Sequence, residues 1–441
     1  MPAEDLLAYG LERGQPALLF LRQRGLFPWS TGQTDIAHLK AVVEAQQERI
    51  AACESDPNPN PRRLFVVPQL LVWNQNPDRY RRSLPDLVFG NPEAPGRVRK
   101  AINFILHRRQ AFVQLGKPID LVEFLGEADQ ATDPEELALK LRFRIRQSLS
   151  LEARVIKGPI IKDSARLRQE ILRTPEMQAE ILRISKENDQ TSQETTREIS
   201  VYLKQMAANF SMAYVEGFVI GLTLLFDRLY NEVVCDQEGL EKVREAGRTA
   251  PLMLLPSHRS HVDYLVISYL FYANGLIPPH IAAGDNLSFF PLGHIFRRSG
   301  AFFLKRSFGH DEAYRVTFRE YLRKLLREGY WIEFFPEGGR SRSGKMLPPR
   351  LGMLHIIVDA IRSGATPDAK LVPIYVGYEK VIEEQAYTNE LAGSTKKRES
   401  ITALLKTTKV LWSKYGRLYV SFGDPFSVKE AIDEAGVGEL E

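Results

Sequence analysis

A histidine and an aspartate, His258 and Asp263, lie five positions apart, directly after an apolar run at residues 252–255. On one helix this spacing would splay the two side chains by roughly 140°. They can therefore meet only if His258 lies in a turn and Asp263 in the first turn of the following helix, for which Ser260 is the expected N-cap. A carboxylate that contacts an imidazole fixes its tautomer and leaves the second nitrogen free to accept a proton. The spacing predicts a general base.

A basic, glycine-rich segment follows at residues 331–345, and its composition suits a phosphate group. An apolar start predicts a strand that runs into the letters EGGRSR at residues 337–342. Glycine lets backbone N–H groups approach phosphate oxygens, and a guanidinium can hold two oxygens at once. The nucleotide-binding pattern G-x-x-x-x-G-K also fits residues 339–345, but Met346 replaces the Ser or Thr that would bind magnesium. A lone histidine in a turn often only makes hydrogen bonds to backbone groups. The basic segment that follows in the sequence favours a catalytic role for His258 instead.

Two further segments add candidate residues. Residues 300–306 predict a short strand, bracketed by the pairs Arg297-Arg298 and Lys305-Arg306. A buried strand with basic ends explains this piece equally well. Residues 370–378 predict another buried strand, which Pro373 interrupts.

The order of strand, polar turn and helix is typical of α/β proteins, which place their chemistry where strands end. We therefore expect a mostly parallel sheet flanked by helices, preceded by a largely helical N-terminal region. The pattern turns apolar from residue 208, which predicts a supporting region at residues 1–205 and a catalytic domain at 206–441. In the supporting region we expect short amphipathic helices at 6–29, helices at 35–54, 98–112 and 163–204 (the last with a solvated charged face), a strand at 64–73, and an edge strand or basic amphipathic segment at 139–145.

The charge distribution narrows the choice of partners. The net charge is +4, but residues 251–350 hold fourteen Lys/Arg and eight Asp/Glu, so this segment carries +6 and the rest −2. Such concentration predicts anionic substrates or an anionic surface rather than nucleic acid, because no nucleic-acid-binding module accompanies it. Two cysteines provide neither a disulfide framework nor a metal cluster. No segment predicts a transmembrane helix, so contact with a membrane would be peripheral.

The four segments together resemble the four ordered blocks of the glycerolipid acyltransferase superfamily, whose signature is H-x-x-x-x-D. The resemblance is closest to glycerol-3-phosphate acyltransferases of the bacterial membrane-bound type. Those bacterial members continue for hundreds of residues past the fourth block, whereas this chain ends soon after it, as a truncated or short member would. The matching stretches are 258–265 for the first block, 300–306 for the second, 335–342 for the third and 371–376 for the fourth, with 278–284 and 295–298 also similar.

The resemblance implies transfer of an acyl group from acyl-CoA or acyl carrier protein to the sn-1 hydroxyl of glycerol 3-phosphate, giving 1-acyl-sn-glycerol 3-phosphate. No cofactor or metal is expected. No Ser-His-Asp or Cys-His set is evident, so the hydroxyl should attack directly, with His258 as base and Asp263 orienting it. The remaining expected site residues are Arg340, Arg342, Lys305 and Arg306 for the phosphate, Arg298 in second rank, Glu337 to orient an arginine or the polyol, Gly338 and Ser341 in the same loop, and Pro373 at the acyl-chain wall.

Three alternatives share some of these features. An acyltransferase for lysophosphatidate or dihydroxyacetone phosphate would have the same four blocks. A non-enzymatic membrane-surface adaptor would keep the basic face but would not need His258 and Asp263 together. A nucleotide-binding protein would bind ATP or GTP with magnesium. For the acyltransferase we expect peripheral or monotopic attachment to the cytoplasmic face of the inner membrane, through apolar patches and basic residues.

Overall fold

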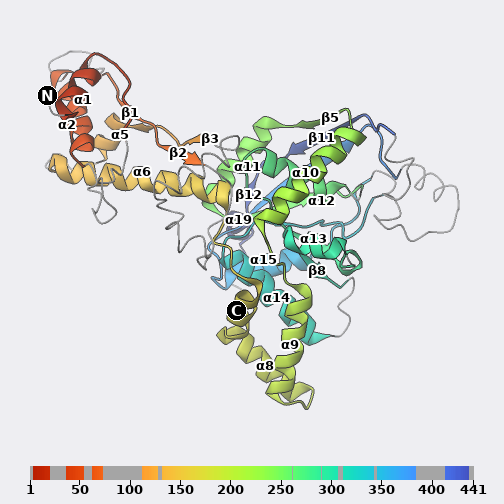
Figure 1. Cartoon of the computed structure of the whole chain (residues 1–441). Helices are drawn as coiled ribbons and strands as arrows, with labels where there is room; N and C mark the ends of the chain where they lie inside the picture. The colour runs from red at the N-terminus through yellow and green to blue at the C-terminus, as the bar shows by residue number, and fades with distance from the viewer. Residues whose placement is uncertain are drawn as a thin grey trace, which may run out of the picture. The chain divides into compact units, whose positions relative to one another are not determined.

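The structure of the protein is a computed structural model, in which the chain divides into two compact units (Figure 1). The described part of the first unit ends at Ala153, and the second begins at Arg154. The structure describes residues 3–19, 36–53, 62–72, 112–127, 132–260, 262–289, 291–305, 311–341, 345–383 and 413–436.

The first unit is built around a small apolar core between helices. Residues such as Val43, Leu121 and Leu141 are fully buried there. The predicted helix at 35–54 is confirmed, whereas the predicted strand at 64–73 is two short strands. Residues 139–145 lie inside a long helix, so the edge-strand alternative was wrong. The elements are α1 Ala3–Glu12, α2 Ile36–Cys53, β1 Phe65–Val66, β2 Gln69–Val72, β3 Phe112–Leu115, β4 Ile119–Asp120, α5 Leu121–Gly126 and α6 Pro134–Lys157, whose last turn belongs to the second unit.

An eight-stranded sheet organises the second unit. Its order is β5-β11-β10-β6-β9-β7-β8, with β12 also paired to β10. The pairs β10–β6, β6–β9, β9–β7, β7–β8 and β5–β11 are parallel, and the two remaining pairs, β10–β11 and β10–β12, are antiparallel. The predicted mostly parallel sheet is thus confirmed. The strands are β5 Glu232–Cys235, β6 Leu252–Pro256, β7 His280–Gly284, β8 Ala301–Leu304, β9 Ile332–Glu333, β10 Lys370–Tyr378, β11 Arg417–Phe422 and β12 Phe426–Ser427.

Helices cover both faces of this sheet because alternate strand residues point to opposite sides. Met253 and Ile332 pack into one apolar cluster with α14 and α15, while Leu252 and Leu254 pack into another with α10, α11 and α12. Strands that are apolar on both faces are typical of parallel sheets buried between helical layers. The helices are α10 Met212–Leu229, α11 Gln237–Thr249, α12 Asp263–Ala273, the 3₁₀ turn η1 Asp285–Leu287, α13 Leu292–Arg298, α14 Glu312–Arg327, α15 Gly352–Arg362 and α19 Val428–Glu434.

Three further helices, α7 Ser164–Leu172, α8 Pro175–Glu187 and α9 Ser192–Met206, confirm the helical prediction for residues 163–204. Thr191 and Glu194 close a capping box at the start of α9, as their spacing favours. The apolar faces of α8 and α9 pack into the same cluster as α14. For that reason the division between units falls at Ala153 rather than near residue 205 as predicted from the apolar pattern.

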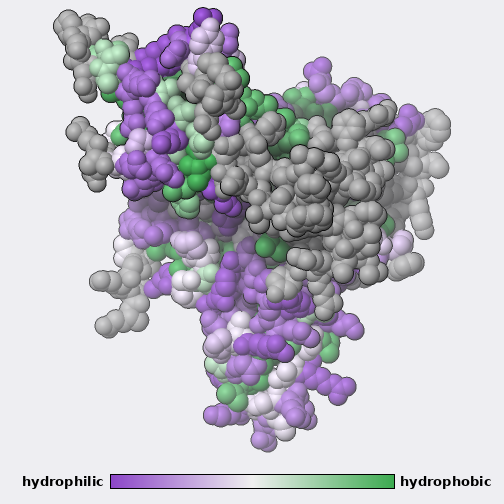
Figure 2. All heavy atoms as spheres, turned by 60° about the vertical axis from the view of Figure 1, so that its left-hand side comes forward, coloured by the Kyte–Doolittle hydropathy of each residue, from purple (hydrophilic) through white to green (hydrophobic). Residues whose placement is uncertain are grey.

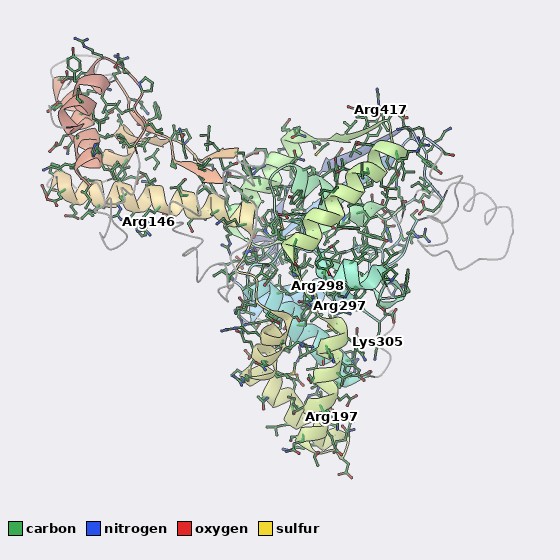
Figure 3. The ribbon with its side chains drawn as sticks, in the orientation of Figure 1. Arg146, Arg197, Arg297, Arg298, Lys305 and Arg417 are labelled. Carbon is green, nitrogen blue, oxygen red and sulfur yellow. The ribbon has the colours of Figure 1, made fainter. Side chains whose placement is uncertain are left out.

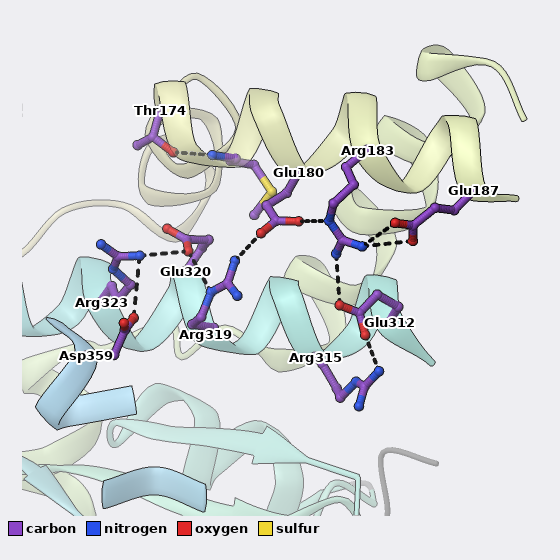
Figure 4. A network of polar contacts seen from close by, with 11 residues as sticks. Thr174, Glu180, Arg183, Glu187, Glu312, Arg315, Arg319, Glu320, Arg323 and Asp359 are labelled. Atoms are coloured by element: carbon purple, nitrogen blue, oxygen red, sulfur yellow. Dashed lines mark hydrogen bonds and ion pairs between the residues drawn. The ribbon is translucent and has the colours of Figure 1, made fainter. Parts of the chain in front are cut away.

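The charged residues of α8 are not simply a solvated face. Arg183 pairs with Glu312 of α14 at 2.9 Å, and Glu180 pairs with Arg319 of α14 at 2.6 Å (Figure 4). These ion pairs join two helices that are far apart in the sequence. On the face drawn in Figure 2, the lobe that contains α8 and α9 is nevertheless mostly hydrophilic. A partly buried network thus replaces the expected solvated arrangement.

The helices predicted at residues 6–29 and 98–112 fall only partly within the described residues. The first predicted amphipathic helix overlaps α1, while residues 20–29 and all of the predicted helix at 98–112 except Phe112, which begins β3, lie outside the described residues. Within the described ranges, no helix combines the length and apolarity needed to cross a bilayer.

Candidate active site

The carboxyl ends of four parallel strands place three predicted parts of the site, and Tyr378, along one edge of the sheet. His258 follows β6, Lys305 follows β8, the EGGRSR loop follows β9, and Tyr378 ends β10. These four strands run parallel to one another within one sheet, although β10 reaches β8 only through β6, β9 and β7. Ligands of open α/β sheets bind at this edge.

His258 and Asp263 meet as the spacing requires. The Nδ1 atom of His258 lies 3.0 Å from Oδ2 of Asp263, which is fully buried at the first position of α12. The same oxygen accepts hydrogen bonds from the backbone N–H groups of Arg259 at 2.7 Å and Ser260 at 2.9 Å. Ser260 is not the N-cap, so that prediction was wrong. Asp263 accepts from the N–H groups of Arg259 and Ser260, while the Ser260 hydroxyl accepts from the N–H of Val262 at 3.2 Å and donates to Glu383.

The contact with Asp263 assigns the proton of the imidazole to Nδ1, because a carboxylate accepts and does not donate. The Nε2 atom is then the proton acceptor. The ring of His258 lies against Phe335, with centroids 4.1 Å apart, and its side chain is 15 % exposed. His258 also lines the large cavity described below. The ring is held in place but reachable from the cavity.

Glu337 joins the histidine turn to the loop after β9. It is 5 % exposed, and its two oxygens accept from the backbone N–H of His258 at 3.0 Å and of Leu347 at 2.8 Å. The N–H of Ser341 donates to the carbonyl of His258 at 2.7 Å, and the Ser341 hydroxyl donates to the carbonyl of Lys345. Glu337 therefore orients backbone groups of the turn and the loop, and its expected role toward an arginine or the polyol stays a prediction. Glu337 and Ser341 lock the loop onto the turn.

Two residues that the sequence analysis missed support the turn from β10. The Tyr378 hydroxyl donates to Oδ1 of Asp263 at 2.5 Å. The buried Glu383 accepts from the Ser260 hydroxyl at 2.9 Å, and its other oxygen lies 3.4 Å from Nη1 of Arg340. No local pattern marks these two residues. Tyr378 is the last residue of β10, and Glu383 follows that strand.

A cavity of about 1100 Å³ opens beside His258. Its wall is mostly apolar and comes from α10, α12, the edges of β7 and β8, and the start of α15. An apolar cavity of this size with a few polar groups is typical of a small-molecule or lipid site. The apolar lining residues are Val215, Phe218, Val219, Leu265, Pro278, Ile281, Ala282, Ala283, Leu287, Phe296, Ala301, Leu304, Phe318, Phe334, Phe335, Leu347, Met353 and Ile356.

Three cationic side chains line the same cavity: Lys305, Arg340 and Arg350. Lys305, which is labelled in Figure 3, is paired with Asp311 at 3.3 Å and lies over the rings of Tyr202 and Tyr314. Arg350, which the sequence analysis missed, is exposed. Its side chain packs where a Cβ at Gly338 would lie, and Gly338 has a φ of +63° that favours glycine.

Some predicted residues fall elsewhere. Arg298 does not line the cavity; its guanidinium lies over the ring of Tyr214, 5.3 Å from the centroid. Pro373 is exposed in β10 and is also absent from the cavity lining, so its position gives no support to a role at the acyl-chain wall. Arg306 and Arg342 lie outside the described residues.

One buried acid lies next to the site without a hydrogen-bond partner in the described part of the chain. Both carboxyl oxygens of Glu333 are unpaired, and the side chain is fully buried in β9. Burial, together with the negative charge of Asp263, raises the pKa of Glu333 well above its ordinary value. The neutral form of Glu333 is therefore favoured. Over the same described ranges, no cluster of three or more His, Cys, Asp or Glu could hold a metal ion.

Comparison with known proteins gives three consecutive family matches. Residues 4–155 match the glycerol-3-phosphate acyltransferase PlsB N-terminal domain, 235–377 match the acyltransferase family, and 387–439 match the glycerol-3-phosphate acyltransferase C-terminal region. Glycerol-3-phosphate acyltransferases of Pseudoalteromonas translucida and Aeromonas hydrophila are each 36 % identical over 84 % of this chain. The match covers 45 % of each relative, so the chain spans less than half of their length.

A solved structure, the 1-acyl-sn-glycerophosphate (LPA) acyltransferase PlsC from Thermotoga maritima, is 18 % identical, with a TM-score of 0.30. The similarity covers 56 % of this chain and 85 % of that structure. At this TM-score the likeness carries no argument about the site.

Proposed function

We propose, from the premise that this chain belongs to the bacterial glycerol-3-phosphate acyltransferase family, that it moves a fatty acyl group from a thioester to the sn-1 hydroxyl of glycerol 3-phosphate. The observation that carries the proposal is the His258–Asp263 pair, whose histidine lines an apolar cavity with cationic residues in its wall. An acyl acceptor that carries a phosphate and a donor that carries a long chain both suit such a cavity.

In the proposed reaction the acceptor hydroxyl attacks the thioester carbonyl directly. Nε2 of His258 takes the hydroxyl proton as the new C–O bond forms, and the C–S bond then breaks. The thiolate leaves and recovers the proton. A thiol of pKa near about 8.5 needs little help in leaving, whereas general-base assistance contributes roughly 10²–10⁴-fold. Asp263 holds the ring and stabilises the positive charge that it acquires.

Arg340 and Arg350 are the proposed partners of the acceptor phosphate. Both line the cavity, as do Gly338 and Gly339, which directly precede Arg340. A guanidinium binds two phosphate oxygens at once, which lysine cannot do. Lys305 is the third cation, and it is paired with Asp311 as Arg340 is with Glu383. The apolar wall suits the acyl chain, and the donor is acyl-CoA or acyl carrier protein.

A peripheral site on the cytoplasmic face of a membrane is the second part of the proposal, and helix α10 supports it. The inner face of α10 lines the cavity, while outward residues Ile220 and Leu224 are 64 % and 69 % exposed. In α11 of the same unit, the exposed positions include the charged residues Glu241 and Lys242. An apolar outer face is typical of a helix that lies on lipid.

Vesicle flotation tests the membrane proposal. The double variant Ile220→Asp/Leu224→Asp should float with anionic vesicles much less than the unchanged protein. A matched control, Leu182→Asp/Val201→Asp, changes exposed apolar residues of α8 and α9 and should leave flotation intact. Equal flotation of both double variants and the parent would refute the assignment of α10.

Product identification tests the proposed activity. Purified chain is incubated with labelled glycerol 3-phosphate and palmitoyl-CoA or palmitoyl-acyl carrier protein, and the lipid is identified. We expect 1-acyl-sn-glycerol 3-phosphate. Acylation of lysophosphatidate or dihydroxyacetone phosphate without acylation of glycerol 3-phosphate would overturn the acceptor. Magnesium-dependent ATP or GTP binding without acyl transfer would favour the nucleotide-binding alternative.

A further inference from the structure

The two oxygens of Asp263 are held very differently. Oδ2 takes three contacts: the His258 ring and the N–H groups of Arg259 and Ser260. Oδ1 has one partner in the described part of the chain, the hydroxyl of Tyr378 at 2.5 Å. Since Asp263 is fully buried, no solvent replaces that donor. The Tyr378 hydroxyl thus provides the hydrogen bond to Oδ1, one of the two carboxylate oxygens.

The sheet explains why residue 378 reaches residue 263. Strand β10 pairs in parallel with β6, with Ile374 opposite Pro256, so both strands reach the same edge together. The Ser257 hydroxyl accepts from the N–H of Val376 at 3.2 Å, which ties the strand to the turn. Burial raises the pKa of Tyr378 well above its ordinary value. The hydroxyl therefore remains a donor throughout the pH range in which an enzyme works.

We propose that Tyr378 is a positioning residue for acyl transfer, which fixes the orientation of the Asp263 carboxylate and disperses its negative charge. The inference rests on the proposed function, since it concerns the same base. Without the Tyr378 hydroxyl, the charge concentrates on a carboxylate that contacts His258 alone among side chains. The imidazolium form of His258 is then favoured at higher pH. Tyr378 thus influences both the orientation of the His258 ring and the pH range in which His258 acts as the base.

Other ionisable groups border the pair. Glu383 is linked to the turn through Ser260 and to Arg340. Glu333 interacts electrostatically with Asp263. The Tyr230 ring lies 6.2 Å from that of Tyr378, and the Tyr230 hydroxyl has no hydrogen-bond partner within the described ranges. The further neighbours are Tyr264 on α12 and Glu337 in the loop.

Tyr230 provides a matched control, because Tyr230→Phe removes a hydroxyl from the same core without removing a hydrogen bond. Tyr378→Phe should lower kcat roughly tenfold, since a hydrogen bond to a charged group is lost, and leave both KM values unchanged. The acidic limb of the kcat/KM profile should move to higher pH. Tyr230→Phe should keep the parent profile.

A second measurement does not depend on turnover. The downfield proton signal of the His258 Nδ1–H, assigned by its loss in His258→Ala, should move further downfield in Tyr378→Phe and stay in place in Tyr230→Phe. If Tyr378→Phe does not fold, 3-fluorotyrosine at position 378 serves instead. The 3-fluorotyrosine hydroxyl is a stronger donor than that of tyrosine. It should therefore move the proton signal upfield and the acidic limb to lower pH.

The inference is overturned if Tyr378→Phe only lowers Tm while the pH limb and the proton signal stay in place. It is also overturned if Tyr230→Phe has the same effects as Tyr378→Phe. An inactive parent protein with the expected proton signals would instead count against the proposed function, so the two failures are distinguishable.

Discussion

Replacing Glu337 with glutamine tests whether this acid holds backbone or binds the polyol. The substitution keeps size and shape but replaces one carboxylate oxygen with an NH₂ group. Both oxygens of Glu337 accept from backbone N–H groups, of His258 at 3.0 Å and of Leu347 at 2.8 Å. Whichever oxygen is replaced, one N–H donor faces another donor in a site that is 5 % exposed.

The expected loss follows from these contacts. Losing a hydrogen bond to a charged group costs about 1.5–3 kcal/mol, and leaving a buried donor unpaired costs about 1–3 kcal/mol. Some relaxation of the loop offsets part of this, so Glu337→Gln should lower the free energy of unfolding by about 3 kcal/mol. Because one of the two N–H groups belongs to His258, kcat should fall as well. The acceptor's KM should change little.

Urea unfolding and steady-state kinetics with glycerol 3-phosphate measure the two effects on the same preparation. Ser341→Ala is a useful comparison, since it removes a hydroxyl that contacts the carbonyl of Lys345 in the same loop but keeps the backbone bond to His258. It should be milder in both respects. If Glu337→Gln retained the parent stability and raised the acceptor's KM, Glu337 would contact the polyol after all, and its role in holding the backbone would be refuted.

Two further predictions concern the phosphate and the core. Arg340→Lys keeps the charge but loses the paired hydrogen bonds to the phosphate. The kcat/KM for glycerol 3-phosphate should therefore fall roughly ten- to a hundredfold, while the KM of the acyl donor hardly changes. A rise in the donor's KM alone would mean that this arginine binds the thioester carrier. Burial between Phe210 and Tyr330 lowers the pKa of His280 to about 4. The unfolded chain therefore binds a proton at this residue below about pH 6.5, whereas the folded chain binds it only below about pH 4. About 3 kcal/mol of the free energy of unfolding is lost as the pH falls through that window. In His280→Phe, Tm should depend less on pH between 7 and 5, and an unchanged dependence would contradict the assignment.

The sequence predicted the parts of the site that depend on local spacing. The strand, turn and helix around His258 and Asp263 are as expected, because an interval of five residues leaves few ways for the two side chains to meet. The N-cap was wrong at Ser260 for a local reason as well. Helix α12 begins at Asp263 with Val262 at its cap position, so the Ser260 hydroxyl lies two residues too early and accepts from the N–H of Val262 within the turn instead.

Long-range contacts were beyond sequence reasoning. Tyr378 reaches Asp263 across 115 positions because β10 happens to pair with β6, and a single sequence contains no signal for that pairing. The boundary between the two units lies at Ala153 rather than near residue 205 for a similar reason. Charged helices at 163–204 look independent along the chain, but their apolar faces pack against α14. Alternation at 139–145 predicted an edge strand as one option, and tertiary packing of Leu141 and Ile145 within α6 overrode it.

The most direct test of the proposed chemistry is the rate of palmitoyl transfer to labelled glycerol 3-phosphate by the purified chain and by folded His258→Ala. We expect that the parent makes 1-acyl-sn-glycerol 3-phosphate and that the variant loses at least about a hundredfold in kcat, the lower end of general-base assistance. Circular dichroism and Tm confirm that the variant is folded. Near-parent turnover by folded His258→Ala would contradict the assignment of His258 as the base.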